Sequence, residues 1–358
     1  MSSGQQVRKL VINTPPDEYP NLSLGENDST FRIEETNIKP DSIENGEVLI
    51  RVIYLSNDPS QRMLIQKGAD PKEMYRPPVK KGEVMPTFGA GEVIKSKSRH
   101  YTEGDIVAGF FSWSDYVLVR EDKILSKIDK DIDPSIFLNL GGYGGLAAYF
   151  GLLKVADVKP NHVVVVSAAS GSTGSIAIQL AKKVIGCKKV IGITGSNEKI
   201  LYVKSLGADA AVNFKSLTFE KKLDEALGEN QVDIFFDNVG GEVLDHVLSR
   251  MSVFGTISVC GAIAGYNKKD EGKIYNWKYI IIRRLRVFGF LLSDHYSEVP
   301  GAIQALFEAV KSGQLSVENS STVVDLSKEK DPFVGIPKAW GLLFESDKKL
   351  GKLVTKIA

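Results

Sequence analysis

Short apolar runs alternate with helical patterns through the middle of the chain. The first run is Val163 to Val166, and the amphipathic stretch SIAIQLAKK follows it after a short turn. Buried runs that alternate with helical segments are typical of a parallel sheet covered by helices on both faces. We expect six such strands, in VVVV, KKVIGIT, AAVNF, VDIFFDNVGG, GTISVCGA and RVFGFLL. The pattern predicts an α/β fold with a doubly wound parallel sheet, the Rossmann fold, whose ligand lies at the carboxyl ends of the strands.

The N-terminal part of the chain has a different pattern. Up to about residue 130, short β-like runs such as EVLIRVIYLS and GAGEVIKS are separated by polar or glycine turns, which favours an antiparallel, barrel-like lobe. The chain ends in KLGKLVTKI, a strand too short to stand alone, and we expect it to return to the first lobe. We therefore predict a β-rich lobe from residues 1–130 plus 306–358 and a nucleotide-binding domain from residues 131–305.

The turn after the first central strand reads SAASGSTG and suits a phosphate group. Gly171 and Gly174 leave no side chain between backbone and ligand, and the next helix directs its unpaired N–H groups and positive dipole end at the turn. The spacing AxxGxxG is weak evidence on its own, because a chain with 33 glycines contains such spacings by chance. An ordinary βα turn is the alternative. The strands that follow favour a dinucleotide site.

The end of the second central strand selects the cofactor. NAD enzymes usually place Asp or Glu there to hold the ribose 2′-hydroxyl, whereas this strand ends in Thr194-Gly195-Ser196-Asn197. Lys199 follows in the first turn of the next helix, where its charge can pair with a 2′-phosphate, and Glu198 projects from another side of that helix. A solvated surface lysine is the alternative. The sequence predicts NADP(H).

Composition narrows the class of protein. The 358 residues suggest two domains, and the net charge of +1 gives no electrostatic reason to bind nucleic acid or a membrane. We see no apolar run of the roughly 18 residues that a membrane span needs. The polar start MSSGQQVRK is unlike a signal peptide, and the two cysteines suit a reducing compartment. We expect a cytoplasmic enzyme.

Catalytic zinc is not expected. Such a site needs about three protein ligands, and a structural zinc site usually needs four. The two cysteines and four histidines are scattered along the chain and do not pair in the N-terminal lobe; they are Cys187, Cys260, His100, His162, His246 and His295. The pattern predicts no metal.

Several strings together resemble a known family. They are YLSNDPSQR, LGGYGGLAAYFGLL, SAASGSTGSIAIQLAK, GSNEK, FFDNVGGE, VCGAIAGYN and LGK, which lie in order over most of the chain. They are similar to the medium-chain dehydrogenase/reductases, in the zinc-independent branch of leukotriene B4 dehydrogenase/prostaglandin reductases and alkenal double-bond reductases. The resemblance implies a GroES-like N-terminal barrel, a homodimer, and NADPH-dependent reduction of the carbon–carbon double bond of α,β-unsaturated aldehydes and ketones.

The resemblance also implies two candidate donors for the substrate oxygen. Tyr266 lies in the loop after the fifth central strand, which leaves the carboxyl edge of the sheet, and the family has a tyrosine there beside the nicotinamide ribose. Tyr54 matches a substrate-contacting tyrosine of the plant reductases. The alternatives are that Tyr266 packs on the cofactor without a chemical role and that Tyr54 is an aromatic residue of the barrel core.

The predicted cofactor contacts combine this resemblance with the turn and strand ends. They are Gly171, Ser172, Thr173, Gly174, Gly195, Lys199, Phe214, Asn238, Cys260, Gly261, Tyr266, Phe290, Leu291 and Leu292. An Asx turn is the alternative for Asn238, and an ordinary edge-strand core is the alternative for residues 290–292.

The chain departs from the family pattern in three places. Phe214 replaces a tyrosine that contacts the 2′-phosphate, although Lys215 is adjacent. Lys349 replaces an asparagine that contacts the cofactor, and Ser60 and Gln61 replace an aromatic residue and a methionine near the active site. These changes leave the reaction class in place and the substrate open. A quinone reductase and a catalytically silent NADPH-binding protein remain alternatives to the alkenal reductase.

Overall fold

The computed structural model describes residues 4–345 and 349–358, so the first three residues of the polar start lie outside it. The chain packs into two compact units. Unit 1 contains Met1–Leu138, Val323–Glu345 and Leu353–Ala358, and unit 2 contains Asn139–Thr322 and Ser346–Lys352. Their bounds differ from the predicted ones mainly near residue 306, because helix α9 (Val299–Lys311) packs on α3 (Tyr143–Phe150) and belongs with unit 2.

Unit 2 is built on a six-stranded parallel sheet with the order β10-β9-β8-β11-β12-β13. This confirms the predicted doubly wound sheet, because the chain proceeds from β8 in one direction and returns beside β8 to proceed in the other. The strands are β8 (Val163–Val166), β9 (Lys189–Thr194), β10 (Ala210–Asn213), β11 (Val232–Asp237), β12 (Met251–Val259) and β13 (Arg286–Gly289).

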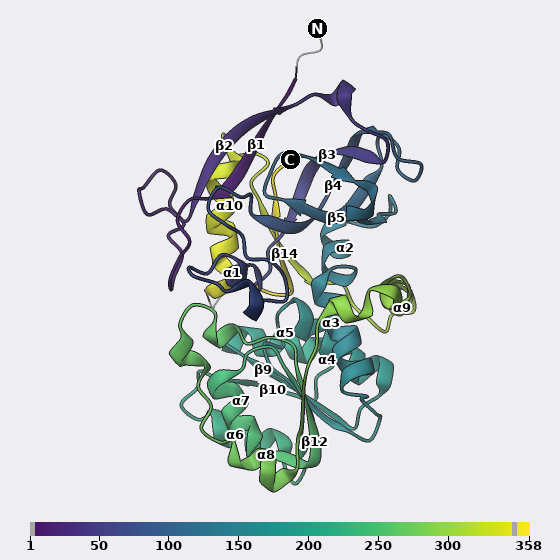
Figure 1. The fold of residues 1–358 in the computed structure, drawn as a ribbon. Helices are drawn as coiled ribbons and strands as arrows, with labels where there is room; N and C mark the ends of the chain where they lie inside the picture. The colour runs from purple at the N-terminus through teal and green to yellow at the C-terminus, as the bar shows by residue number, and fades with distance from the viewer. Residues whose placement is uncertain (1–3, 346–348) are drawn as a thin grey trace. The chain divides into compact units, whose positions relative to one another are not determined.

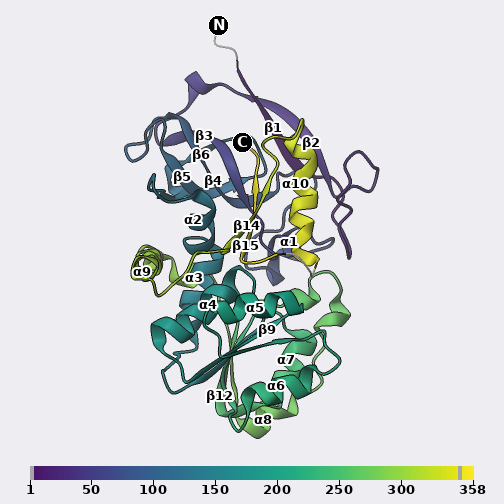
Figure 2. The same ribbon diagram turned by 180° about the vertical axis from the view of Figure 1, so that it is seen from behind.

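Helices cover both faces of this sheet. The intervening helices are α4 (Ser172–Gln179), α5 (Asn197–Ser205), α6 (Phe219–Leu227), α7 (Gly241–Leu248) and α8 (Lys278–Arg283). Val163 and Val165 pack with buried residues of α6 and α7, and those two helices lie with α8 on one side of the strands (Figures 1 and 2). Val164 and Val166 are also fully buried. Burial of every side chain explains why the strand is a continuous valine run.

Unit 1 is the predicted β-rich, antiparallel lobe. Its larger sheet has seven strands in the order β14-β15-β3-β4-β5-β7 with β6 paired to β3, and β1 and β2 form a separate hairpin. The C-terminal strand returns as expected, since Val354 of β15 pairs with Ser56 of β3. The strands are β1 (Gln5–Ile12), β2 (Phe31–Ile38), β3 (Glu47–Ser56), β4 (Pro86–Ser96), β5 (Ile106–Ser112), β6 (Tyr116–Arg120), β7 (Ile124–Lys127), β14 (Ser321–Asp325) and β15 (Lys352–Lys356).

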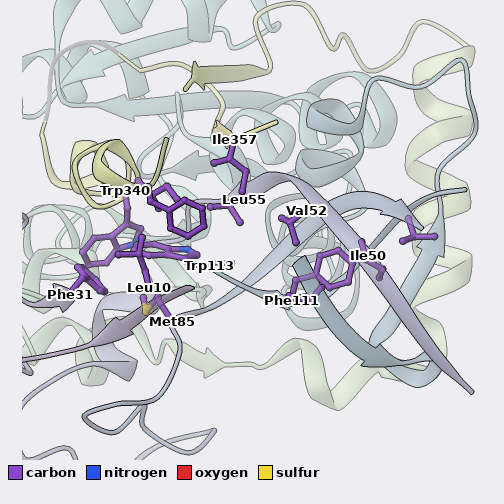
Figure 3. Close-up of a cluster of buried hydrophobic side chains, with 14 of the residues drawn as sticks. Leu10, Phe31, Ile50, Val52, Leu55, Met85, Phe111, Trp113, Trp340 and Ile357 are labelled. Carbon is purple, nitrogen blue, oxygen red and sulfur yellow. The ribbon is translucent and has the colours of Figure 1, made fainter. Parts of the chain in front are cut away.

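Three aromatic rings form the centre of this lobe. Phe31 lies 5.0 Å from Trp113 and 6.0 Å from Trp340, between ring centroids, and all three side chains are fully buried. Figure 3 shows the two tryptophans against Phe31, with Leu10 and Met85 beside them. Trp340 belongs to α10 (Pro332–Gly341), so aromatic packing fixes this late helix to strands from the start of the chain.

One helical stretch bears on the expectation that no apolar run is long enough to span a membrane. Residues 134–155 combine α2 (Pro134–Leu140), α3 and the π-helical turn η4 (Gly151–Val155), and are long and apolar enough to cross a membrane by length and composition. Within the protein, 78% of the most apolar 18-residue part of this stretch is buried. Such burial is typical of an apolar helix in the core of a protein.

Candidate functional site

The turn between β8 and α4 brings backbone unusually close to backbone. A Cβ atom on Gly174 would lie 2.3 Å from the carbonyl oxygen of Ala168 and 2.7 Å from Cα of Ala169. Only glycine fits there without a shift of the main chain. Gly171 is the N-cap of α4 and no side chain caps the helix, whose first residues are Ser172 and Thr173. This is the local geometry of a phosphate-binding turn.

The turn is held from outside by two segments that sequence reasoning did not connect to it. Gly351 N donates to Ser170 O at 2.8 Å, and Gly351 pairs with Gly171 in a parallel bridge. Asn139, which is fully buried, accepts from Ser172 Oγ at 2.6 Å and donates to Ser320 O at 2.9 Å. In the sequence, the only indication of this role is that Asn139 is a single amide residue within the apolar run before Gly142. Lys349 precedes Gly351 by two residues in the chain.

The ends of β9 and β10 form the side predicted for the adenosine phosphate. Thr194 ends β9, and a Cβ atom on Gly195 would lie 3.4 Å from the ring of Phe214 and 4.0 Å from Cε of Lys215. Lys199 is half-buried in the first turn of α5. The side chains beside Gly195 are therefore an aromatic ring and an ammonium chain. This arrangement fits a 2′-phosphate and lacks the acid that would hold a ribose hydroxyl.

The ends of β11 and β12 bring three other predicted residues together. A Cβ atom on Gly261 would lie 3.1 Å from the carbonyl oxygen of Asn238 and 3.5 Å from the hydroxyl of Tyr266. Ala262 N donates to the Tyr266 hydroxyl at 3.4 Å. The loop thus returns over the carboxyl end of the sheet and places Tyr266 beside Asn238, on the opposite side of β8 from Lys199.

Two weakly acidic side chains lie close by, the fully buried Asp237 and the half-buried Cys260. Asp237 ends β11 and is fully buried, and burial raises the pKa of its carboxyl group. Burial, with a contribution from Asp237, raises the pKa of the Cys260 thiol to about 12. The thiol is therefore protonated near pH 7, and a thiol in that state is a poor nucleophile. Cys260 can meet a cofactor by packing or through its backbone.

The segment after β13 is anchored to η4. Phe290 packs against Gly151, where a Cβ atom would lie 2.7 Å from Cζ of the Phe290 ring. Leu291 is 38% exposed and its N–H donates to Asp294 Oδ2 at 3.2 Å. Phe290 is therefore half-buried against η4, whereas Leu291 is exposed. Residues 290–292 remain predicted contacts.

The second donor candidate, Tyr54, and two of the substituted family positions, Ser60 and Gln61, belong to unit 1. Tyr54 is a half-buried residue of β3, and burial raises the pKa of its hydroxyl. Gln61 is buried, donates to Pro86 O at 2.7 Å and accepts from Asp58 N at 2.9 Å. Gln61 therefore stabilises the loop in which it lies by these two hydrogen bonds. Ser60, the preceding residue, is half-buried.

Metal-ligating side chains do not gather in the described part of the chain. Over residues 4–345 and 349–358, no group of three or more His, Cys, Asp or Glu side chains has an arrangement that could hold a metal ion. The histidines have other partners: His246 pairs with Glu220 at 2.9 Å, and His295 stacks on Phe150 at 4.5 Å.

Replacement of Gly174 by Ala tests the turn. The added methyl group overpacks a main-chain contact at a cost of about 1–3 kcal/mol, so we expect Gly174→Ala to lower the melting temperature and raise the dissociation constant for NADPH at least about tenfold. Gly301→Ala in α9 is the control, because its Cβ atom would meet nothing within 4 Å. Unchanged NADPH affinity in Gly174→Ala would show that the turn does not hold the phosphates.

Comparison with known families agrees with both units. Residues 172–308 match the family model described as zinc-binding dehydrogenase, and residues 23–128 match the N-terminal domain of oxidoreductase. The first description names a metal, but its matched residues belong to unit 2, which holds the nucleotide-type sheet.

Individual relatives cover most of the chain. An uncharacterized membrane protein of Saccharomyces cerevisiae is 33% identical over 97% of both chains. The NADP(+)-dependent 2-alkenal reductase of Nicotiana tabacum is 34% identical over 88% of both chains, and prostaglandin reductase 1 of Mus musculus is 34% identical over 92% of this chain and 94% of its own.

A solved structure agrees with the cofactor as well as the fold. CurA from Vibrio vulnificus in complex with NADPH has a TM-score of 0.84 and 28% identity, and covers 98% of this chain and 99% of its own. The cofactor of this chain is NADP(H), as the missing acid after Thr194 predicted. The chain is an NADP-dependent oxidoreductase of the zinc-independent medium-chain dehydrogenase/reductases, and belongs to the branch of alkenal and prostaglandin reductases.

Proposed function

We propose that this enzyme uses NADPH to reduce the carbon–carbon double bond of α,β-unsaturated aldehydes and ketones. The observation that carries the proposal is the Tyr266 hydroxyl beside Asn238 and Gly261, at the carboxyl ends of β11 and β12. A hydroxyl donor there suits a carbonyl substrate. The names of the tobacco and mouse relatives, a 2-alkenal reductase and a prostaglandin reductase, support the same class of reaction.

The residues of unit 2 divide the task of holding NADPH. Residues 171–174 would receive the pyrophosphate at the start of α4, and Lys199 with Lys215 would face the 2′-phosphate. Asn238, Gly261 and residues 290–292 would line the nicotinamide half. NADPH, when bound, supplies the hydride that adds to the β-carbon of the substrate.

Tyr266 would stabilise the charge that develops on the substrate oxygen. Addition of hydride to an enal or enone leaves negative charge on the carbonyl oxygen, and a fixed O–H donor aimed at that oxygen lowers the barrier. The Tyr266 hydroxyl accepts from Ala262 N, and a hydroxyl that accepts a hydrogen bond keeps its own proton as a donor. Tyr54 is the second donor in this proposal.

A homodimer completes the proposal. β13 lies at the edge of the six-stranded sheet, and all four of its residues are exposed, including Val287 and Phe288. An exposed apolar edge strand readily pairs with a second copy of itself.

We further propose a cytoplasmic location, supported by the burial of residues 134–155 and by the cysteine content, although the yeast relative carries the name of a membrane protein.

Substrate class is tested by NADPH consumption with a matched panel of 2-alkenals, enones and quinones. We expect turnover of the alkenals and enones, with product analysis showing a saturated aldehyde or ketone. Turnover of quinones alone would assign a quinone reductase. Tight NADPH binding without any turnover would assign a catalytically silent binding protein.

Cofactor choice is tested at Lys199. Lys199→Ala should raise the KM for NADPH and leave that for NADH nearly unchanged, because a charge-assisted contact to the 2′-phosphate contributes about 1–3 kcal/mol. Lys204→Ala, an exposed lysine of the same helix, is the control and should change neither value. Equal catalytic efficiency of the parent enzyme with both cofactors would contradict this assignment.

The donor role is tested by Tyr266→Phe, which keeps the ring and removes the hydroxyl. Loss of one such donor typically lowers kcat about 10²–10³-fold. We expect a fall of at least about tenfold, because Tyr54 can share the task, with little change in NADPH affinity. Tyr275→Phe, at a largely exposed loop tyrosine, is the control. Weaker NADPH binding at unchanged kcat would make Tyr266 a packing residue and direct the test to Tyr54.

A further inference from the structure

Two buried polar residues join the strand ends on either side of the sheet's switch point. Ser167 follows β8 and Asp237 ends the neighbouring strand β11; both are fully buried. Ser167 Oγ donates to Asp237 Oδ1 at 2.8 Å, and Ser167 N donates to Phe236 O at 3.1 Å. The carboxylate also accepts from Val239 N at 3.0 Å and Gly240 N at 3.1 Å. A buried carboxylate is thus satisfied by one hydroxyl and two backbone amides, at the start of α7.

The same serine holds Asn238 by two further hydrogen bonds. Asn238 N donates to Ser167 Oγ at 2.8 Å, and Asn238 Nδ2 donates to Ser167 O at 2.8 Å. The second bond fixes which way the side-chain amide faces. A carbonyl oxygen accepts only, so the nitrogen of the amide, and not its oxygen, must face Ser167.

The opposite edge of the amide is therefore an acceptor. Across residues 4–345 and 349–358, no described group donates to Asn238 Oδ1, and this oxygen is not sealed from solvent. Asn238 is half-buried and lies beside Gly261, near the Tyr266 hydroxyl. A ligand group that meets this edge must bring a hydrogen-bond donor.

We infer that Ser167 and Asp237 are positioning residues that fix Asn238 so that its oxygen accepts a hydrogen bond from the nicotinamide half of NADPH. Two groups of that half are donors, the ribose hydroxyls and the carboxamide NH₂. A phosphate oxygen is excluded as the partner because it accepts and carries negative charge. The inference rests on the NADP(H) cofactor of the proposed function and is independent of its carbonyl substrate.

Binding measurements without substrate test this inference. We would titrate the full-length protein and its variants with NADPH and with adenosine 2′,5′-bisphosphate, which carries the adenosine half alone. Asn238→Ala should raise the dissociation constant for NADPH at least about fivefold, as expected for one lost hydrogen bond. The dissociation constant for the bisphosphate should stay within about twofold of the parent, since that ligand lacks the donor.

Ser167→Ala should give the same pattern with a smaller loss for NADPH, because the backbone bond from Asn238 Nδ2 remains. Ser252→Ala is the matched control: Ser252 Oγ also donates to a carboxylate of β11, Asp233, at 2.9 Å, but near the amino end of that strand. It should leave both dissociation constants unchanged. Should Ser167→Ala fail to fold, Asn238→Ala at its half-buried position carries the test alone.

A reduced NADP analogue with 3-acetylpyridine in place of nicotinamide separates the two donors, because its acetyl group has no N–H. If the carboxamide is the donor, Asn238→Ala costs NADPH affinity but little affinity for the analogue. If a ribose hydroxyl is the donor, both ligands lose equally. Parent-like NADPH affinity of Asn238→Ala would overturn the inference, as would a parallel loss of bisphosphate affinity. Since no carbonyl substrate is present, inactivity toward alkenals would count against the proposed function alone.

Discussion

The close contact between the first turn of α4 and the main chain of Ala168 fixes the start of this helix against the end of β8, and the proposed cofactor site depends on it. With only a hydrogen at Gly174, the helix start lies directly on the end of β8. β8 lies between β9 and β11 in the parallel sheet. The start of α4 therefore also marks the point where the order of the strands reverses. A dinucleotide centred there would have one half at the ends of β9 and β10 and the other at the ends of β11 and β12.

The two halves of this site use different physical chemistry. The ring of Phe214 and the chain of Lys215 lie beside Gly195, where a dianionic phosphate is expected. Beyond β8 the charge is buried and satisfied internally: Asp237 accepts from a serine hydroxyl and two backbone amides, and so organises a turn. In the proposed site, charge would therefore select the cofactor on one side, whereas directional hydrogen bonds between neutral groups would orient it on the other.

Sequence reasoning predicted the parts that depend on local pattern. Each of these parts can be recognised from a few neighbouring residues: the valine run of β8, the glycines of the turn and the missing acid after Thr194. The bonds of Ser167 to Asp237 and of Gly351 to Ser170 could not be predicted, because each joins segments that are distant in sequence and only the fold brings together. The end of unit 2 was misplaced for the same reason, since α9 resembles any amphipathic helix until its packing on α3 is seen.

The central claim is that the start of α4 divides the cofactor between these two sets of strand ends, and a crystal structure of the enzyme with NADPH bound tests it most directly. The account predicts the pyrophosphate at residues 171–174, the 2′-phosphate beside Lys199 and Lys215, and the nicotinamide beside Asn238, Gly261 and Tyr266. A cofactor bound in the reverse direction, with its 2′-phosphate at the ends of β11 and β12, would contradict the account.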